Sequence, residues 1–121
     1  MAAIALVYKI LTAADWQAAT ASGLYAGSAD DIRDGFIHLS TREQLAETAA
    51  RHFRGRSDLV LVALDAVRLG PQLRWEPSRG GALFPHLYDL LDVAAGRQVW
   101  PMPLGADDVP ILPPYTLDEA T

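Results

Sequence analysis

Residues 33–44, RDGFIHLSTREQ, decide the expected fold because a short apolar strand runs directly into a helix start. FIHL is typical of a short buried strand, and STRE follows it with Ser40 as the expected N-cap and Glu43 three residues later. The next apolar residues recur every four positions, as on one face of a helix: Leu45, Ala49 and Phe53. We therefore predict a strand that ends near His38 and a helix that follows directly and ends near Phe53.

The rest of the chain predicts one more helix and several more strands. Thr12 can cap a helix that ends at Gly23, and Asp15 occupies the acidic position three residues after the cap. Residues 25–35 are polar and rich in turn formers, which predicts a loop. The expected strands are short apolar or alternating segments: 4–11, 36–39, 59–65, 72–76, 82–89 and 97–104.

These elements predict an α+β domain with a mixed, mostly antiparallel sheet and two helices in the N-terminal half. The near-continuous apolar run of the first strand indicates that both of its faces are covered, and the prolines of the last strand suit a sheet edge. We expect a single domain over residues 1–104. Residues 105–121 form an acidic, proline-containing tail that we expect to dock loosely and then fray.

Composition excludes several classes of protein. The 121 residues include no cysteine, which rules out disulfides and thiolate chemistry and fits a reducing compartment. The formal charge is −5 and the arginines are scattered, so we expect no nucleic-acid partner. The apolar N-terminus lacks a signal-peptide pattern and is interrupted by Lys9, well short of a membrane span. A cytoplasmic protein without membrane contacts, with the monomer slightly favoured, is the expectation.

Alternation along two extended segments brings histidines and aromatic side chains together. Alternate residues of a strand share a face, so one face of each segment carries a histidine together with the residues two positions before and after it. These residues are Phe36, His38 and Ser40 in one segment, and Phe84, His86 and Tyr88 in the other. Glu76 ends the strand before a glycine-rich loop. A pocket bounded by the two histidines, Tyr88 and Glu76 would combine aromatic walls with hydrogen-bonding groups, as small-molecule sites do.

We treat His38, His86 and Glu76 as candidate catalytic groups, and Ser40 and Tyr88 as candidate ligand contacts. Two arginines in polar loops near the expected pocket, Arg33 and Arg79, are candidates for binding a phosphate or carboxylate. No metal site is expected, because the histidines and carboxylates show no recognised ligand spacing.

Each candidate also has a purely structural interpretation. His38 could bond a nearby backbone group, His86 could fix a turn, and Tyr88 could be a core residue. Four polar candidates have local alternatives as well: Ser40 as an N-cap, Glu76 in a surface ion pair with Arg74 or Arg79, and Arg33 and Arg79 as solvated side chains. His52, at the end of the second helix beside two arginines, is interpreted as a local cap.

Three stretches resemble the bacterial domain-of-unknown-function family 952: YKILTAADW, SADDIRDGFIHLST and LRWEPSRGGALFPHLY. The resemblance covers nearly the whole chain up to the final strand. The combination of DGFIHLS, WEPSRGG and FPHLY is specific to that family.

The resemblance implies an ADP-ribosyltransferase-like fold, in which a split, mostly antiparallel sheet holds NAD in a cleft. FIHLST is similar to the HVHLS segment of tRNA 2′-phosphotransferases. Where many members of that superfamily carry a ribose-contacting histidine on the first strand, this chain has Lys9. Lys9 is therefore a candidate ligand contact that could donate a hydrogen bond to a ribose or pyrophosphate but cannot accept one. The segment HLYG common in the family is here HLYD, with Asp89 in place of glycine.

Three functions of different classes are open, of which the third is an interaction protein whose proline-rich tail contacts a partner. The first is a domain that binds NAD, ADP-ribose or a related nucleotide, with transfer of a group from it as the possible reaction. The second is a non-catalytic module that binds another metabolite or a protein partner, and Lys9 in place of the histidine favours this alternative.

Overall fold

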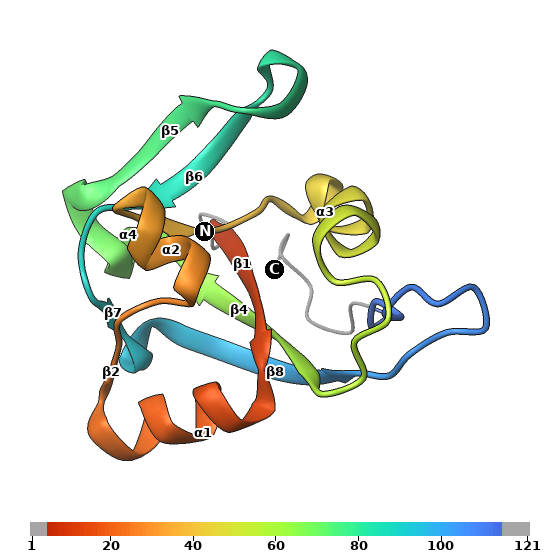
Figure 1. Ribbon diagram of the computed structural model, residues 1–121. Coiled ribbons are helices and arrows are strands. Elements are labelled where there is room, and N and C mark those ends of the chain that lie inside the picture. The colour runs from red at the N-terminus through yellow and green to blue at the C-terminus, as the bar shows by residue number, and fades with distance from the viewer. Residues whose placement is uncertain (1–4, 115–121) are drawn as a thin grey trace.

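The computed structural model describes residues 5–114, in which three of the predicted strands form one antiparallel sheet (Figure 1). They are β1, Leu6–Thr12, β4, Leu59–Asp65, and β8, Gly96–Met102, in the order β1-β4-β8. Five consecutive residues of β1 are buried, which confirms that both of its faces are covered. β8 contains Pro101 and lies at the edge of this sheet, also as predicted.

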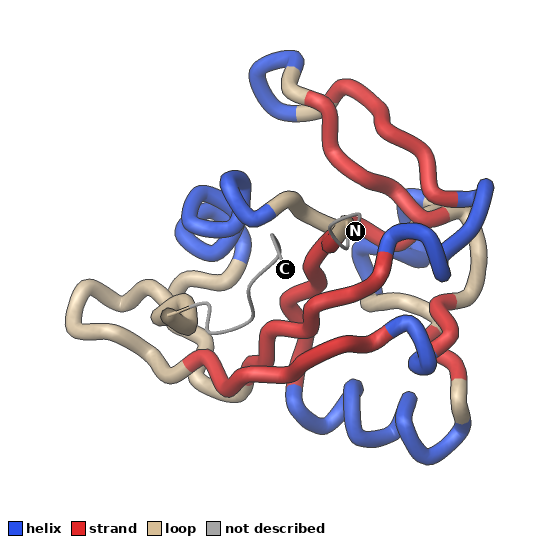
Figure 2. The backbone as a smooth tube through the Cα atoms, turned by 180° about the vertical axis from the view of Figure 1, so that it is seen from behind, coloured by secondary structure: helices blue, strands red, loops and turns tan. Residues whose placement is uncertain are grey.

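A second antiparallel sheet has the order β3-β6-β5. β3 is Ile37–His38, β5 is Leu73–Pro77 and β6 is Leu83–Leu87. β5 and β6 form a hairpin that extends away from the β1-β4-β8 sheet (Figures 1 and 2). The strands expected in FIHL, QLRWE and ALFPHLYD are therefore confirmed.

The two sheets meet at Ser40, where the chain passes from one to the other. Leu39 N–H still donates to Pro85 O of β6 at 3.1 Å. One residue later, Tyr8 N–H donates to Ser40 O at 2.8 Å, and Ser40 N–H donates to Tyr8 O at 2.9 Å. Every strand pairing in residues 5–114 is antiparallel, so the predicted α+β class with antiparallel sheets is confirmed and its mixed character is not.

Both helices predicted from capping signals are present. α1 is Ala13–Ser22; Asp15 N–H donates to Thr12 Oγ1 at 3.0 Å, and Gly23 ends the helix in the left-handed region. α3 is Leu45–His52, ending next to Phe53, and a 3₁₀ turn precedes it.

The expected Ser40–Glu43 cap of the second helix is wrong by one residue. Thr41 is the N-cap, and its N–H donates to Gln44 Oε1 at 3.0 Å. The shift has a tertiary cause: the backbone of Ser40 is already committed to pairing with Tyr8.

The loop predicted for residues 25–35 contains a helix instead. α2 is Ala29–Asp34 and begins with a capping box: Asp31 N–H donates to Ser28 Oγ at 3.2 Å, and Ser28 N–H donates to Asp31 Oδ2 at 2.9 Å. The short α4, Ala66–Leu69, and the strand pair β2, Leu24–Tyr25, with β7, Leu91–Asp92, were also not expected. The remaining elements are 3₁₀ turns: η1 Arg42–Gln44, η2 Gly70–Gln72, η3 Arg79–Gly81 and η4 Val93–Ala95.

Each face of the β1-β4-β8 sheet packs against its own hydrophobic cluster. One cluster joins Val7 and Leu64 to Ala19 of α1, and the other joins Tyr8 and Leu61 to residues of α3 that include Leu45. The sheet therefore fixes α1 and α3 on its two sides, and α3 lies toward the β5–β6 hairpin. No helix within residues 5–114 is long and apolar enough to cross a membrane.

The described part of the tail, residues 105–114, contacts the end of α3. Gly55 N–H donates to Asp108 O at 2.8 Å, and Arg54 Nη1 donates to Asp107 O at 3.1 Å. Leu112 packs on the second hydrophobic cluster, whereas Ile111 is half exposed. The fraying expected at the chain end concerns residues 115–121, which lie outside the described residues.

Gly27 provides a test of the turn that leads into α2. Its φ is +116°, and a Cβ atom there would lie 2.8 Å from Asp31 Cβ. Gly27→Ala should therefore lower the free energy of unfolding by about 2 kcal/mol or more, through backbone strain and displacement of Asp31. Gly80→Ala is the matched control, because Gly80 also has a positive φ but open space around it. If urea denaturation showed that Gly27→Ala and Gly80→Ala lower the free energy of unfolding equally, the proposed crowding at Asp31 would be contradicted.

Candidate functional site

The chain's only lysine is buried in an ion pair between β1 and α2. Lys9 is 6% exposed and Asp31 is 2% exposed. Lys9 Nζ lies 2.9 Å from Asp31 Oδ2 and also donates to His38 O at 3.0 Å. One ammonium group therefore connects β1, α2 and β3.

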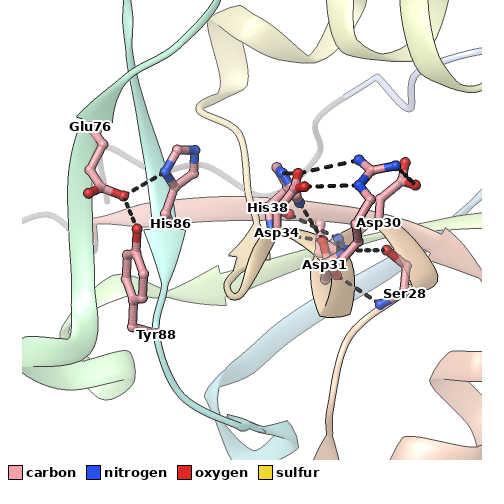
Figure 3. Close-up of polar contacts among 10 residues, drawn as sticks. Ser28, Asp30, Asp31, Asp34, His38, Glu76, His86 and Tyr88 are labelled. Carbon is pink, nitrogen blue, oxygen red and sulfur yellow. Dashed lines mark hydrogen bonds and ion pairs between the residues drawn. The ribbon is translucent and has the colours of Figure 1, made fainter.

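Asp31 accepts hydrogen bonds at both carboxylate oxygens. Oδ2 receives Lys9 Nζ and the N–H of Ser28, while Oδ1 receives His38 N–H at 3.0 Å and lies 2.6 Å from His38 Nδ1 (Figure 3). Burial on its own raises the pKa of Asp31, but the hydrogen bonds from His38 and the charge of Lys9 outweigh it and hold that pKa well below its ordinary range. Asp31 is thus an ionised carboxylate that positions other residues.

His38 lies between two carboxylates of the same helix. Nδ1 faces Asp31, and Nε2 lies 2.9 Å from Asp34 Oδ2. Both ring nitrogens can donate to these carboxylates only when the ring is protonated. The side chain is 38% exposed, so one nitrogen of His38 lies at the buried carboxylate of Asp31 and the other at the more exposed carboxylate of Asp34.

Arg33 and two acidic residues of α2 form an exposed rim. Arg33 Nε lies 3.0 Å from Asp34 Oδ1, and Nη1 lies 3.2 Å from Asp30 Oδ1. The hydrogen bond from Arg33 lowers the pKa of Asp34. The rim therefore carries charge of both signs next to His38.

Glu76, His86 and Tyr88 form a second hydrogen-bonded group on the hairpin side. His86 Nδ1 lies 2.8 Å from Glu76 Oε1, and Tyr88 Oη donates to the same oxygen at 2.7 Å (Figure 3). These two hydrogen bonds, that of Tyr88 first, lower the pKa of Glu76. The Phe36 ring stacks on His86 with 4.0 Å between centroids, which fixes the imidazole plane.

The two histidines meet, as the alternation of the strands predicted. Their residues are directly paired between β3 and β6, and the ring centroids are 5.8 Å apart. Both rings border a cleft of about 180 Å³ between α2, β1, α3 and the hairpin. The convergence of His38 and His86 is therefore confirmed, whereas their chemical roles stay predictions.

The predicted site residues divide into those in the cleft and those behind it. Five of them border the cleft: Lys9, Arg33, His38, Ser40 and His86. Glu76 and Tyr88 stand behind His86 rather than in the cleft wall. The structure does not describe the side chain of Arg79. The hydroxyl of Ser40 lies 3.3 Å from that of Thr48, so Ser40 links α3 to the bridge between the sheets.

Sequence reasoning missed Asp31, Asp34 and the cleft position of His52. His52, interpreted from the sequence as a local cap, borders the same cleft at the end of α3. Asp31 had a local signal, because Ser28 followed three residues later by an acid is the capping-box pattern. No local pattern could show that this acid pairs with Lys9, 22 positions away. Within residues 5–114, no group of three histidines or acids is arranged to hold a metal ion.

These observations define an α+β domain with a split antiparallel sheet and a cleft bordered by two carboxylate-bound histidines. A family model described as a protein of unknown function, DUF952, matches residues 10–99. The chain therefore belongs to the DUF952 family.

Solved structures of one bacterial protein are similar over most of the chain. The crystal structure of CC0527 from Caulobacter crescentus has 55% sequence identity and a TM-score of 0.85, and the match covers 88% of this chain and 93% of that one. The solution NMR structure of CC0527 has 55% identity and a TM-score of 0.78, over 87% and 90% of the two chains. No curated protein matches the chain.

Asp31→Asn tests the buried ion pair. The substitution leaves Lys9 buried without its counter-ion and should lower the free energy of unfolding by about 3–5 kcal/mol at neutral pH. Because the pKa of Asp31 is lower in the folded than in the unfolded chain, its stabilising contribution is full above about pH 5 and is lost as the pH falls below the ordinary aspartate value of about 3.9. In Asp31→Asn, the free energy of unfolding should no longer fall with pH through protonation of residue 31.

Melting curves from about pH 2 to 7 measure both effects, and Asp30→Asn is the control because Asp30 is exposed on the same helix. A variant as stable as the wild type, with the same acid sensitivity, would show that the pair does not hold the fold together.

Proposed function

We propose that the cleft binds a ribose-containing nucleotide, such as NAD or ADP-ribose. One observation carries the proposal: two imidazoles from neighbouring strands border the same cleft, and each has its Nδ1 beside a carboxylate. Both imidazoles keep one orientation; Nε2 of His86 is open to a ligand, whereas Nε2 of His38 lies 2.9 Å from Asp34 Oδ2. The hydroxyl groups of a ribose can form hydrogen bonds with imidazole nitrogens and with carboxylates.

The other walls suit the remaining parts of a nucleotide. Phe53 and Phe84 border the cleft and offer apolar surface to a base, while Arg33 on the rim can contact a phosphate. The cleft volume of about 180 Å³ is below the ~300–1,000 Å³ of pockets that enclose whole drug-sized ligands. We therefore expect the ribose and one adjoining group inside the cleft and the rest of the nucleotide along the rim.

Transfer of a group from the nucleotide is the reaction suggested by the resemblance to ADP-ribosyltransferase-like proteins. The split antiparallel sheet agrees with that resemblance. Fold likeness alone does not define a reaction, so binding is the better supported part of the proposal.

Lys9 favours a second candidate, a non-catalytic module for another metabolite or a protein partner. The first-strand histidine of the superfamily contacts ribose, whereas the ammonium of Lys9 is bonded to Asp31 and to His38 O. A residue bonded in this way supports the cleft instead of reaching the ligand. A polar metabolite without a nucleotide base would then be the occupant.

Thermal shift distinguishes these candidates. A nucleotide that binds the native state should raise the melting temperature, with about 2.7 kcal/mol of added stability at a concentration 100 times Kd. NAD, ADP-ribose and AMP should each produce a shift if the ribose is recognised, and D-ribose 5-phosphate separates sugar recognition from base recognition. No shift with any of these compounds would contradict nucleotide binding and leave the second candidate.

His38→Ala tests the residue within the same assay. The variant loses hydrogen bonds to two carboxylates and should lose about 1–3 kcal/mol of stability without ligand. It should also show no shift with ADP-ribose. Arg68→Ala, exposed on α4 and away from the cleft, should keep both the stability and the shift. A His38→Ala protein with an unchanged ligand shift would make His38 a structural residue only.

A further inference from the structure

We propose that Nε2 of His86 accepts a proton from a hydroxyl group in the cleft, and that Glu76 and Tyr88 are positioning residues that hold His86 in the required tautomer. This inference rests on the proposed nucleotide function for its substrate and deepens it by naming the acceptor atom. The hydroxyl belongs to an alcohol or to water.

The hydrogen bonds of Glu76 determine which nitrogen of His86 carries the proton. Tyr88 Oη donates to Glu76 Oε1, and His86 Nδ1 lies 2.8 Å from that same oxygen. Because these contacts lower the pKa of Glu76, its carboxylate is ionised near neutral pH and can only accept. The proton between them therefore sits on Nδ1, and Nε2 of the neutral ring carries a lone pair.

The register of the hairpin places this arrangement on the cleft side. His86 of β6 is paired with Arg74 of β5, and Glu76 is two positions along β5, on the same face. Phe36, stacked at 4.0 Å, prevents the imidazole from turning. Figure 3 shows Glu76 at one edge of the ring and the second nitrogen at the far edge.

Nε2 of His86 has a location that calls for a ligand. The side chain is only 8% exposed and borders the cleft, and no described residue forms a hydrogen bond with Nε2. Nε2 is not among the buried atoms without a partner, so it is open to the cleft and can accept a hydrogen bond from a water or ligand donor there. A hydroxyl group supplies that donor, whereas a phosphate oxygen does not.

His38 has the complementary arrangement. Both of its nitrogens face carboxylates of α2, so neither is open to a ligand, whereas Nε2 of His86 can accept a hydrogen bond from one. With 5.8 Å between the ring centroids, one sugar can contact both residues. The two histidines therefore differ in role because their neighbours differ.

The chemical step follows from the lone pair. The O–H bond of the hydroxyl breaks, its proton forms a bond to Nε2, and its electron pair stays on the oxygen. That oxygen bonds to the ribose C1′ of an NAD-type ligand, the bond from C1′ to the nicotinamide nitrogen breaks, and the neutral base leaves with the electron pair. Glu76 stabilises the imidazolium formed on His86.

Nitrogen-15 NMR of the full chain tests the tautomer without any ligand. Long-range proton–nitrogen correlations should show His86 with a protonated Nδ1 and an unprotonated Nε2 above neutral pH. Glu76→Gln, whose amide can also donate, should raise the fraction with protonated Nε2. Asp89→Asn, which removes a nearby exposed carboxylate, should leave the tautomer unchanged. A wild-type ring protonated at Nε2 would overturn the proposal whatever the protein binds.

Addition of ADP-ribose or D-ribose tests the contact with a hydroxyl group. The Nε2 signal of His86 should move with at least one of these probes, and failure of both to move it would overturn the proposal. A signal moved by D-ribose in a protein whose melting temperature no nucleotide raises would support the hydroxyl contact while refuting the nucleotide function.

Release of nicotinamide from NAD tests the chemical step. His86→Ala should lower the rate by about 10²–10⁴-fold if His86 is the proton acceptor. Glu76→Gln should lower the rate and change its pH profile, while Tyr88→Phe should produce a smaller loss and Asp89→Asn none. His86→Ala with an undiminished rate would overturn the assignment, and circular dichroism melts confirm that the compared variants are folded.

Discussion

The buried ion pair between Lys9 and Asp31 is the interaction on which the arrangement of the cleft depends. Removing two charges from water costs several kcal/mol per ion, so such a pair persists only where further hydrogen bonds satisfy it. Here Asp31 accepts from Lys9, from the N–H of Ser28 and from two nitrogens of His38, and Lys9 also donates to His38 O. One strand, the short helix α2 and the end of β3 are thereby fixed relative to one another.

That constraint explains why α2 can be helical at all. Isolated helices this short are unstable in water, and α2 has six residues, of which only Ala29 and Ile32 are apolar. Ile32 is 68% exposed, so burial of an apolar stripe does not hold the helix in place. Asp31 does so instead, through the capping box at one oxygen and through Lys9 and His38, and this brings Arg33 and Asp34 to the rim of the cleft.

The sequence predicted the parts of the fold that local patterns control. Apolar runs and alternation located the main strands, the Thr12–Gly23 signals located α1, and the face shared by alternate residues brought His38 and His86 together. The errors arose where contacts distant in the sequence decide the outcome. α2 was missed because its support is a lysine 22 positions from Asp31. The N-cap of the 3₁₀ turn before α3 is Thr41 and not Ser40, because Ser40 pairs with Tyr8.

The same distinction applies to the candidate site. The family resemblance suggested Lys9 as a ligand contact, and the residue pattern suggested Glu76 as a catalytic group. Lys9 borders the cleft, but its ammonium is bonded to Asp31 and to His38 O, and Glu76 stands behind His86. The residues that face the cleft are thus separated from those that orient them, and only three-dimensional contacts reveal the division.

Charge balance at the rim explains why a ligand with both anionic and hydroxyl groups suits the proposed function. Asp30, Asp31 and Asp34 lie against Lys9, Arg33 and His38, so groups of both charge signs stand at this side of the cleft. A phosphate can contact this rim at the exposed guanidinium of Arg33. His86, bonded to Glu76 on the other wall, lies outside this cluster and can offer its lone pair independently. The proposed nucleotide would use both properties at once, with a phosphate at the rim and its ribose beside the hydroxyl group that is bound at Nε2 of His86.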